Sequence, residues 1–363
     1  MAWLLENAAL PLRYRAAAEV AGLDDAARML SWMPYAHAPA IELALAQSPD
    51  GTWNSSMLTV PSPRAEGIDG VGTIQAIRRL LEYGWTKDSP PLMLARRVLF
   101  RMLAEDNDPG LLFEFGGRTK IDEDSARFAR QLMREAAAAT LAQAGYSDDP
   151  RLRGAARRIL DRIADFVGSP LAERPWVRVG NKQVLAAEAA PPSIYALHML
   201  AHLPLVRTEN HAAMEAVYAW ITRPLPRQEP VQLVGKKLIP VPHLVLGDVL
   251  PHRNAVDADV PFAIQWLELA ARLGFLQKQD TWGRFIDRFV DDSDRTGVWH
   301  PHKGLAAARS NDPYVWAAYP LETQAGGEER WTDITFRVGL IARLAGREIE
   351  ITEVGGRRSG VGG

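Results

Sequence analysis

Short apolar segments with helical spacing recur along the chain, and most of them stop at a glycine. They are rich in Ala, Leu and Ile, and we expect each to form a buried helix. Five of the six end at a glycine, and the fourth is followed by Pro204. Glycine suits a helix end because it tolerates the positive φ of that position. The segments are residues 12–22, 73–84, 136–145, 193–203, 260–274 and 334–346.

An amphipathic segment with Arg, Asp and Glu on one face follows most of these apolar segments. This pattern predicts a second helix that faces water on its charged side. These segments are residues 38–47, 89–106, 149–166, 209–222 and 280–292. The repeat length of about 60 to 70 residues predicts six helix-pair units. Such units either close into a ring with an inner and an outer shell or stack as an open superhelix.

Two segments break the helical pattern. Residues 176–184 alternate around Gly180-Asn181, and residues 231–239 alternate around Gly235-Lys236. Alternation around a glycine-containing turn predicts a β-hairpin. We therefore expect an all-α ring of helix pairs in a single domain, residues 1–350, with two short β-hairpin insertions. The glycine-rich residues 351–363 are expected to form a flexible tail.

The composition narrows the classes of function. The chain has 363 residues, 42 Lys and Arg against 44 Asp and Glu, and no cysteine. The net charge of −2 is inconsistent with a broad basic surface, so we expect no nucleic-acid partner. The lack of cysteine excludes disulfides, cysteine-ligated zinc, iron–sulfur clusters and thiol catalysis. We find no signal peptide and no membrane-spanning segment, and we expect a cytoplasmic protein with no cofactor.

One motif resembles a known family. Gln47, Gly51 and Trp53 fit the pattern Q-x-x-x-G-x-W, and Gly297 and Trp299 repeat its second half. The pattern resembles the QW repeat of the squalene-cyclase-like proteins, in the superfamily of terpenoid cyclases and protein prenyltransferases. The glycine allows a sharp exit from a helix, the Trp covers the helix end, and the Gln hydrogen-bonds open backbone groups. The resemblance implies an (α/α)6 toroid.

A second motif resembles the catalytic sequence of that superfamily. Asp257-Ala258-Asp259-Val260-Pro261 is similar to the D-x-D-D motif of class II terpene cyclases, with Val260 in place of the last Asp. The resemblance implies that Asp259 protonates an alkene or epoxide and that Asp257 supports it. The substrate would be hydrophobic and isoprenoid-like, and the reaction an acid-initiated cyclisation or isomerisation. The alternative is that one of these carboxylates caps a helix with Pro261 in its first turn.

Further polar and aromatic residues are candidates for the substrate cavity. Asp122 and Asp124 open the third apolar helix, where they face the ring mouth, hold a divalent cation or cap the helix. His198 and His202 lie one helical turn apart, which suits either a metal or packing inside the ring. Aromatic residues on inner helices either line a cavity or fill the core, and the two candidates are Tyr195 and Trp266.

Two other functions remain open at this level. The first is a non-catalytic toroid that binds a hydrophobic small molecule or a partner protein. The second is a carbohydrate-active (α/α)6 barrel, which needs two carboxylates about 5 to 10 Å apart across a sugar. Asp124 and Asp259 are the candidates for that pair, because they open different inner helices. The oligomeric state is left open.

Overall fold

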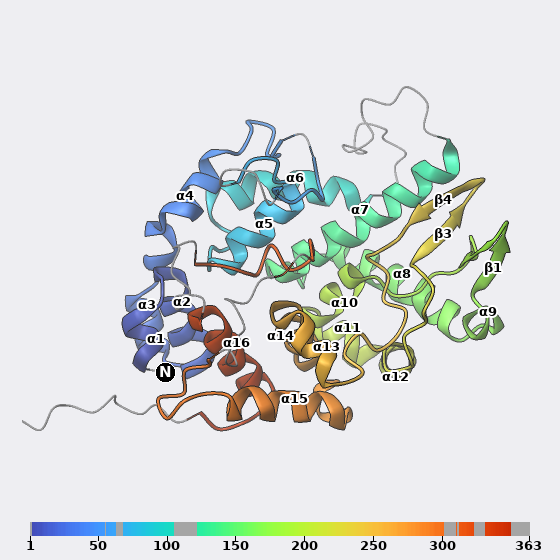
Figure 1. Ribbon diagram of the computed structural model, residues 1–363. Coiled ribbons are helices and arrows are strands. Elements are labelled where there is room, and N and C mark those ends of the chain that lie inside the picture. The colour runs from blue at the N-terminus through green and yellow to red at the C-terminus, as the bar shows by residue number, and fades with distance from the viewer. Residues whose placement is uncertain are drawn as a thin grey trace, which may run out of the picture. The chain divides into compact units, whose positions relative to one another are not determined.

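The computed structural model describes residues 2–54, 56–62, 68–104, 122–300, 310, 312–322 and 331–349. In these residues the protein is largely helical, with one small four-stranded sheet (Figure 1). The predicted tail, residues 351–363, lies outside them. The backbone contacts divide the chain into two compact units. Unit 1 comprises Met1–Glu42, Glu82–Trp85 and Val256–Gly363, and unit 2 comprises Leu43–Leu81 and Thr86–Ala255.

Each predicted apolar segment contains a helix. The first combines α2 (Leu10–Arg15) with the π-helical segment η1 (Ala16–Ala21). The others are α5 (Thr73–Glu82), α7 (Glu123–Gln143), α10 (Ile194–Ala201), α14 (Val260–Leu273) and α16 (Trp331–Leu344). The five stop glycines have φ between +64° and +88°, which confirms their role at helix ends. They are Gly22, Gly84, Gly145, Gly274 and Gly346.

The predicted amphipathic segments are also helical. They are α4 (Ala38–Leu45), α6 (Pro90–Leu103), α8 (Pro150–Val167), α15 (Asp280–Asp291), and the pair α11 (Pro204–Glu209) and α12 (His211–Ile221). The expected single helix over 209–222 is thus interrupted at Asn210, whose φ of −125° is not helical. Its side-chain amide donates to the Val206 carbonyl at 2.7 Å, and such local bonds compete with the helix.

Six shorter helical elements are too short to show a periodic pattern in the sequence. They are α1 (Ala2–Asn7), α3 (Asp24–Met29), η2 (Met33–Ala36), α9 (Pro170–Glu173), α13 (Arg253–Ala258) and η5 (Leu276–Lys278). None of the helices in the described ranges combines the length and the apolar character that crossing a bilayer requires.

Both predicted hairpins are present, and they join into one sheet. The strands are β1 (Trp176–Val179), β2 (Lys182–Leu185), β3 (Val231–Val234) and β4 (Lys237–Pro240), in the order β1-β2-β3-β4. The two hairpins lie side by side because β2 pairs with β3 in parallel, with Leu185 opposite Gln232 (Figure 1). The Gln232 amide also donates to the carbonyls of Ala186 and Ala189, at 3.1 and 2.7 Å. These bonds join segments distant in sequence.

Helix α7 is central to unit 2. It packs against α6, α8, α10 and β3. Four consecutive alanines, Ala136 to Ala139, are buried in its C-terminal half. Their small side chains allow α10 to approach closely, while the polar N-terminal half of α7 lies beside β3 and β4 (Figure 1). In unit 1, α14 packs against α16, which also contacts η1 and α15.

The motif at residues 47–53 has the expected stabilising geometry. The Gln47 amide donates to the carbonyls of Gly51 and Pro91, at 3.1 and 2.9 Å. Gly51 has a φ of +90°. Trp53 is fully buried, and its Nε1 donates to the Leu43 carbonyl near the end of α4 at 2.8 Å. The motif therefore closes a helix end and carries no chemistry.

The related turn at residues 294–299 repeats the same contacts. The backbone N–H of Trp53 donates to Thr73 Oγ1 at 3.0 Å, and that of Trp299 donates to Thr335 Oγ1 at 3.0 Å. Each acceptor threonine lies near the start of the following apolar helix, α5 or α16. This shared bonding pattern is a structural repeat within the chain.

Candidate functional site

A pocket of about 500 Å³ lies in unit 2 between α7, β3 and the segments 187–191 and 243–244. We call it the α7–β3 pocket. Its apolar lining includes Phe128, Leu132 and Leu244. Its polar lining consists of Asp124, Arg127, Gln131, Glu135, Arg162, Glu188, Gln232 and His243.

Helical spacing explains why α7 supplies so much of this lining. Residues three or four positions apart lie on the same helix face. Asp124, Arg127, Gln131 and Glu135 follow that spacing. They run from the exposed first turn of α7 to the buried middle of the helix. The polar face of the helix therefore becomes one wall of the pocket.

Glu135 is the buried anchor of the pocket, with 3% of its surface exposed. Its carboxylate forms an ion pair with Arg162 of α8 and accepts a 2.5 Å hydrogen bond from Ser193 Oγ. Ser193 in turn caps α10 by accepting from the Ala196 N–H at 2.9 Å. Glu135 thus connects α7, α8 and the start of α10. It holds the Arg162 guanidinium in a fixed position at the pocket wall.

His243 is a largely buried histidine in the lining of the pocket. It is 7% exposed, and its ring centroid lies 6.0 Å from that of Phe128. Burial lowers its pKa to about 4, with Glu135 opposing and Arg162 reinforcing the shift, so the ring is neutral at pH 7. Its backbone carbonyl accepts from the Ile194 N–H at 2.8 Å. The side chain of His243 is one of the groups that line the α7–β3 pocket.

The opposite wall is formed by the second hairpin. Gly235 has a φ of +57°, and a Cβ there would lie 2.6 Å from Asp124 Oδ2. Glycine suits this position because it tolerates the positive φ and leaves room for the Asp124 side chain. The hairpin is also attached to α7 by an ion pair between Lys237 Nζ and Asp122 Oδ2 at 2.5 Å. These two contacts hold the β3–β4 turn against the start of α7.

Of the residues predicted to line a substrate cavity, Asp124 borders this pocket. Asp122 is not among its lining residues and is the N-cap of α7, where it accepts from the Ser125 N–H at 2.9 Å. Hydrogen bonds from Lys237 and Ser125 hold the pKa of Asp122 well below its usual range. The capping alternative is therefore confirmed for Asp122, which is an ionised structural residue.

The two predicted catalytic carboxylates lie in unit 1. Asp259 is the N-cap of α14, and its Oδ1 accepts from the Phe262 N–H at 3.0 Å, as the capping alternative predicts. Asp257 lies in α13, where it forms an ion pair with Arg288. The two carboxylates therefore have separate partners in the structure.

A third carboxylate, which the sequence did not single out, lies near Asp259. Ser310 Oγ donates to Asp259 Oδ2 at 2.7 Å and accepts from the Asp312 N–H at 3.1 Å. Burial raises the pKa of Asp312, and the charge of Asp259 raises it further. Asp312 follows no recognisable motif and is distant in the sequence, so no local signal identifies it.

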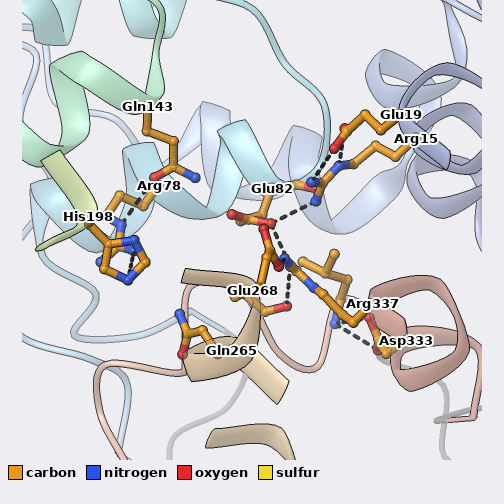
Figure 2. A network of polar contacts seen from close by, with 12 residues as sticks. Arg15, Glu19, Arg78, Glu82, Gln143, His198, Gln265, Glu268, Asp333 and Arg337 are labelled. Atoms are coloured by element: carbon orange, nitrogen blue, oxygen red, sulfur yellow. Dashed lines mark hydrogen bonds and ion pairs between the residues drawn. The ribbon is translucent and has the colours of Figure 1, made fainter. Parts of the chain in front are cut away.

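The predicted histidine pair is hydrogen-bonded within unit 2. His198 Nε2 lies 3.4 Å from Arg78 Nη2, and Arg78 Nε donates to Gln143 Oε1 at 3.2 Å (Figure 2). His202 Nδ1 lies 2.9 Å from the His198 carbonyl oxygen. Among the described residues, no three His, Cys, Asp or Glu side chains are grouped so that they could hold a metal.

The two predicted cavity aromatics belong to the core. Tyr195 of α10 is 1% exposed and Trp266 of α14 is 3% exposed. Trp266 packs edge-on against Trp282, with ring centroids 6.0 Å apart. Neither residue borders the α7–β3 pocket. Their side chains fill the space between helices, which was the alternative interpretation of aromatics at these positions.

Unit 1 contains an ion network with a buried centre, which we define as Arg15, Glu19, Glu82, Glu268, Arg272 and Arg337. Figure 2 labels all of these residues except Arg272. Arg337 contacts Glu82 and Glu268, each at 2.5 Å. Arg15 contacts Glu82 at 2.7 Å. Burial favours the neutral acids, but the arginines outweigh it, holding the pKa of Glu82 well below its usual range and that of Glu268 at about 2. These carboxylates remain ionised and provide no acid at neutral pH.

A comparison of the chain with known proteins gives no match to a protein-family model, to a curated protein or to a solved structure.

Proposed function

We propose that the protein binds a small, uncharged polar molecule in the α7–β3 pocket. The observation that carries this proposal is His243, a largely buried and neutral imidazole that lines the pocket. A neutral imidazole offers one donor and one acceptor. A ligand in the pocket can use both without bringing a charge, because the ring is neutral. Pocket ligands are typically oriented by a few such polar groups among apolar ones.

The charges around the pocket favour an uncharged ligand. The guanidinium of Arg162 is balanced by Glu135. Arg127 lies 3.3 Å from Glu123 and 3.9 Å from Asp124. Glu188, at the exposed rim, adds one negative charge. With the arginine charges already balanced, hydrogen bonding is left as the main source of specificity.

The test is ligand-observed NMR with defined probes. The neutral probes are D-glucose, D-mannose, D-xylose and myo-inositol, and the charged probes are citrate, phosphate and spermidine. We expect binding of at least one neutral probe and a loss of at least tenfold in affinity in His243→Leu. Leucine fills a similar volume and removes both hydrogen-bonding nitrogens.

The matched control is His211→Leu, at an exposed position on α12 with 80% of its side chain accessible. It should bind like the wild type. Preference for a charged probe, or equal affinity of His243→Leu and the wild type, would contradict the proposal.

We further propose that the helix pairs form an (α/α)6 toroid. The support is the shared bonding at Trp53 and Trp299, together with glycine helix stops at a regular interval. A crystal structure in which successive pairs stack in a line would contradict this arrangement.

Acid-initiated isoprenoid chemistry is a second candidate function. The observation that favours it is the raised pKa of Asp312, a hydrogen-bonded neighbour of Ser310 beside Asp259. Such chemistry requires a general acid, and a raised pKa favours the protonated form of a carboxyl group. The test is incubation with squalene and with geranylgeranyl diphosphate. We expect a cyclised product from the wild type and at least tenfold less from Asp312→Asn and Asp259→Asn. Absence of product from the wild type, or equal product from all three proteins, would remove this candidate.

A further inference from the structure

A second hollow adjoins the α7–β3 pocket in unit 2. It is lined by Arg158, Asp161, Arg162, Asp165, Phe166, Ser169, Leu171, Glu188 and Ala190. We call it the α8 groove, and it is more open to solvent than the pocket. Arg162, Glu188 and Ala190 line both hollows. The pocket and the groove are therefore neighbouring parts of one depression, with Arg162 at their junction.

The α8 groove has a regular polar wall. Arg158, Asp161, Arg162 and Asp165 are three or four positions apart, so they lie along one face of α8. Arg158, Asp161 and Asp165 are exposed. Arg162 retains 29% of its side-chain exposure while it pairs with Glu135. The wall thus presents a row of charged hydrogen-bonding groups beside the pocket, of which Arg162 is held by Glu135.

We infer that the pocket and the groove together bind a linear chain of sugar units. This inference rests on the proposed function, because it places the first unit beside His243. Sugar hydroxyls both donate and accept, which matches the neutral imidazole, the side-chain amide oxygens of Gln131 and Gln232, and the carboxylates of the lining. The apolar side of a sugar ring can pack on Phe128. The open groove then receives the following units along Asp161 and Asp165.

The volume of the α7–β3 pocket agrees with placing one sugar unit in the pocket and the following units in the α8 groove. About 500 Å³ falls within the usual range for sites that enclose one small molecule. A longer chain must leave such a site, and the α8 groove is the adjoining depression available to it. Arg162 lies where the chain would pass from one part to the other. Its guanidinium is held by Glu135 and can donate to a linking oxygen.

The experiment compares sugar monomers with sugar chains by isothermal titration calorimetry. The probes are D-glucose, D-xylose and D-mannose, each with a matching linear tetrasaccharide: cellotetraose, xylotetraose and mannotetraose. We expect at least one tetrasaccharide to bind at least tenfold more tightly than its monomer. Asp165→Asn should weaken tetrasaccharide binding at least threefold and leave monomer binding within twofold.

The matched control is Asp148→Asn, which makes the same charge change at an exposed position outside both hollows. It should leave both affinities unchanged. Equal affinities for monomer and tetrasaccharide, or equal effects of the two Asn variants, would overturn the chain-binding inference and leave the pocket proposal standing. If no sugar binds while myo-inositol does, the sugar-chain inference is wrong and the pocket proposal stands. If no neutral probe binds, the sugar-chain inference and the pocket proposal are both wrong.

Discussion

At the scale of single residues, His243 shows how burial sets the chemistry of a side chain. The ring lies among Phe128, Glu135 and Arg162, and desolvation outweighs the attraction of Glu135 for a proton. The result is an imidazole that stays neutral far below its ordinary pKa. The pKa of His243 is therefore lower in the folded protein than in the unfolded chain, where it has its ordinary value. This difference in pKa makes the free energy of unfolding depend on pH.

We predict that the free energy of unfolding falls as the pH is lowered from about 6.5 to about 4. In this window the unfolded state binds a proton at His243 and the folded state does not, so acid favours unfolding. The loss attributable to His243 is about 3 kcal/mol, on the basis of about 1.4 kcal/mol per pKa unit. Urea denaturation at several pH values measures it.

The variant His243→Leu should lack this part of the pH dependence and should be no less stable than the wild type at pH 5. An unchanged slope between pH 6.5 and 4 in His243→Leu would show that His243 is not neutral in the folded protein.

At the scale of elements, the turn after α4 joins this helix to the next part of the chain through a few local bonds. Gln47, Gly51 and Trp53 satisfy open backbone groups and cover the helix end. Gly51 is required for two reasons. Its φ is +90°, and a Cβ would lie 3.0 Å from the Leu94 carbonyl oxygen.

We predict that Gly51→Ala destabilises the protein by about 2 kcal/mol, within the range of about 1 to 3 kcal/mol for a strained backbone position. The matched control is Gly154→Ala within α8, where the nearest atom to the new Cβ is the flexible Arg158 Nη1 at 3.7 Å. That change should stabilise by about 0.5 to 1 kcal/mol because alanine is the better helix former. Urea midpoints that shift in the same direction for both variants would contradict the role of Gly51.

At the scale of the whole molecule, the ion network joins parts of unit 1 that are far apart in the sequence. Arg15, Glu82, Glu268 and Arg337 come from α2, α5, α14 and α16. Arg337 is the central member because it contacts two carboxylates and also donates to the Ala318 carbonyl at 3.1 Å. Removing one partner of a buried pair is costly because a charge remains without compensation.

We predict that Arg337→Met destabilises the protein by about 3 to 5 kcal/mol at pH 7. The matched control is Arg347→Met, which removes an exposed ion pair with Asp287 and should cost less than about 1 kcal/mol. Thermal or urea unfolding at pH 7 measures both variants.

The pH dependence gives a further check on Arg337. The lowered pKa values of Glu82 and Glu268 mean that the wild type loses stability as the pH falls from about 4.5 towards 2. Without Arg337 these buried acids take up protons more readily, so the difference between variant and wild type should shrink at low pH. A difference that is the same at pH 7 and pH 4 would contradict this account.

The sequence by itself determined the local features of this protein. The helix stops at Gly22 and Gly274, the caps at Asp122 and Asp259, and the turns of the two hairpins depend on neighbouring residues, so their patterns could be read directly. The cyclase-like role of Asp259 stays a prediction, since the resemblance that suggests it rests on a short motif.

Tertiary structure alone decided which side chains meet. Glu135, Arg162, Ser193 and His243 form one site although they belong to four separate segments. The same is true of the ion network, and of Asp312 beside Asp259. From the sequence, a charged residue on a helix is expected to be exposed. In the structure, some of these residues are buried beside a partner of opposite charge. Whether a charged side chain is buried depends on how closely distant helices approach one another. Small side chains such as Ala136 to Ala139 permit a close approach, but the sequence does not show which helix they meet.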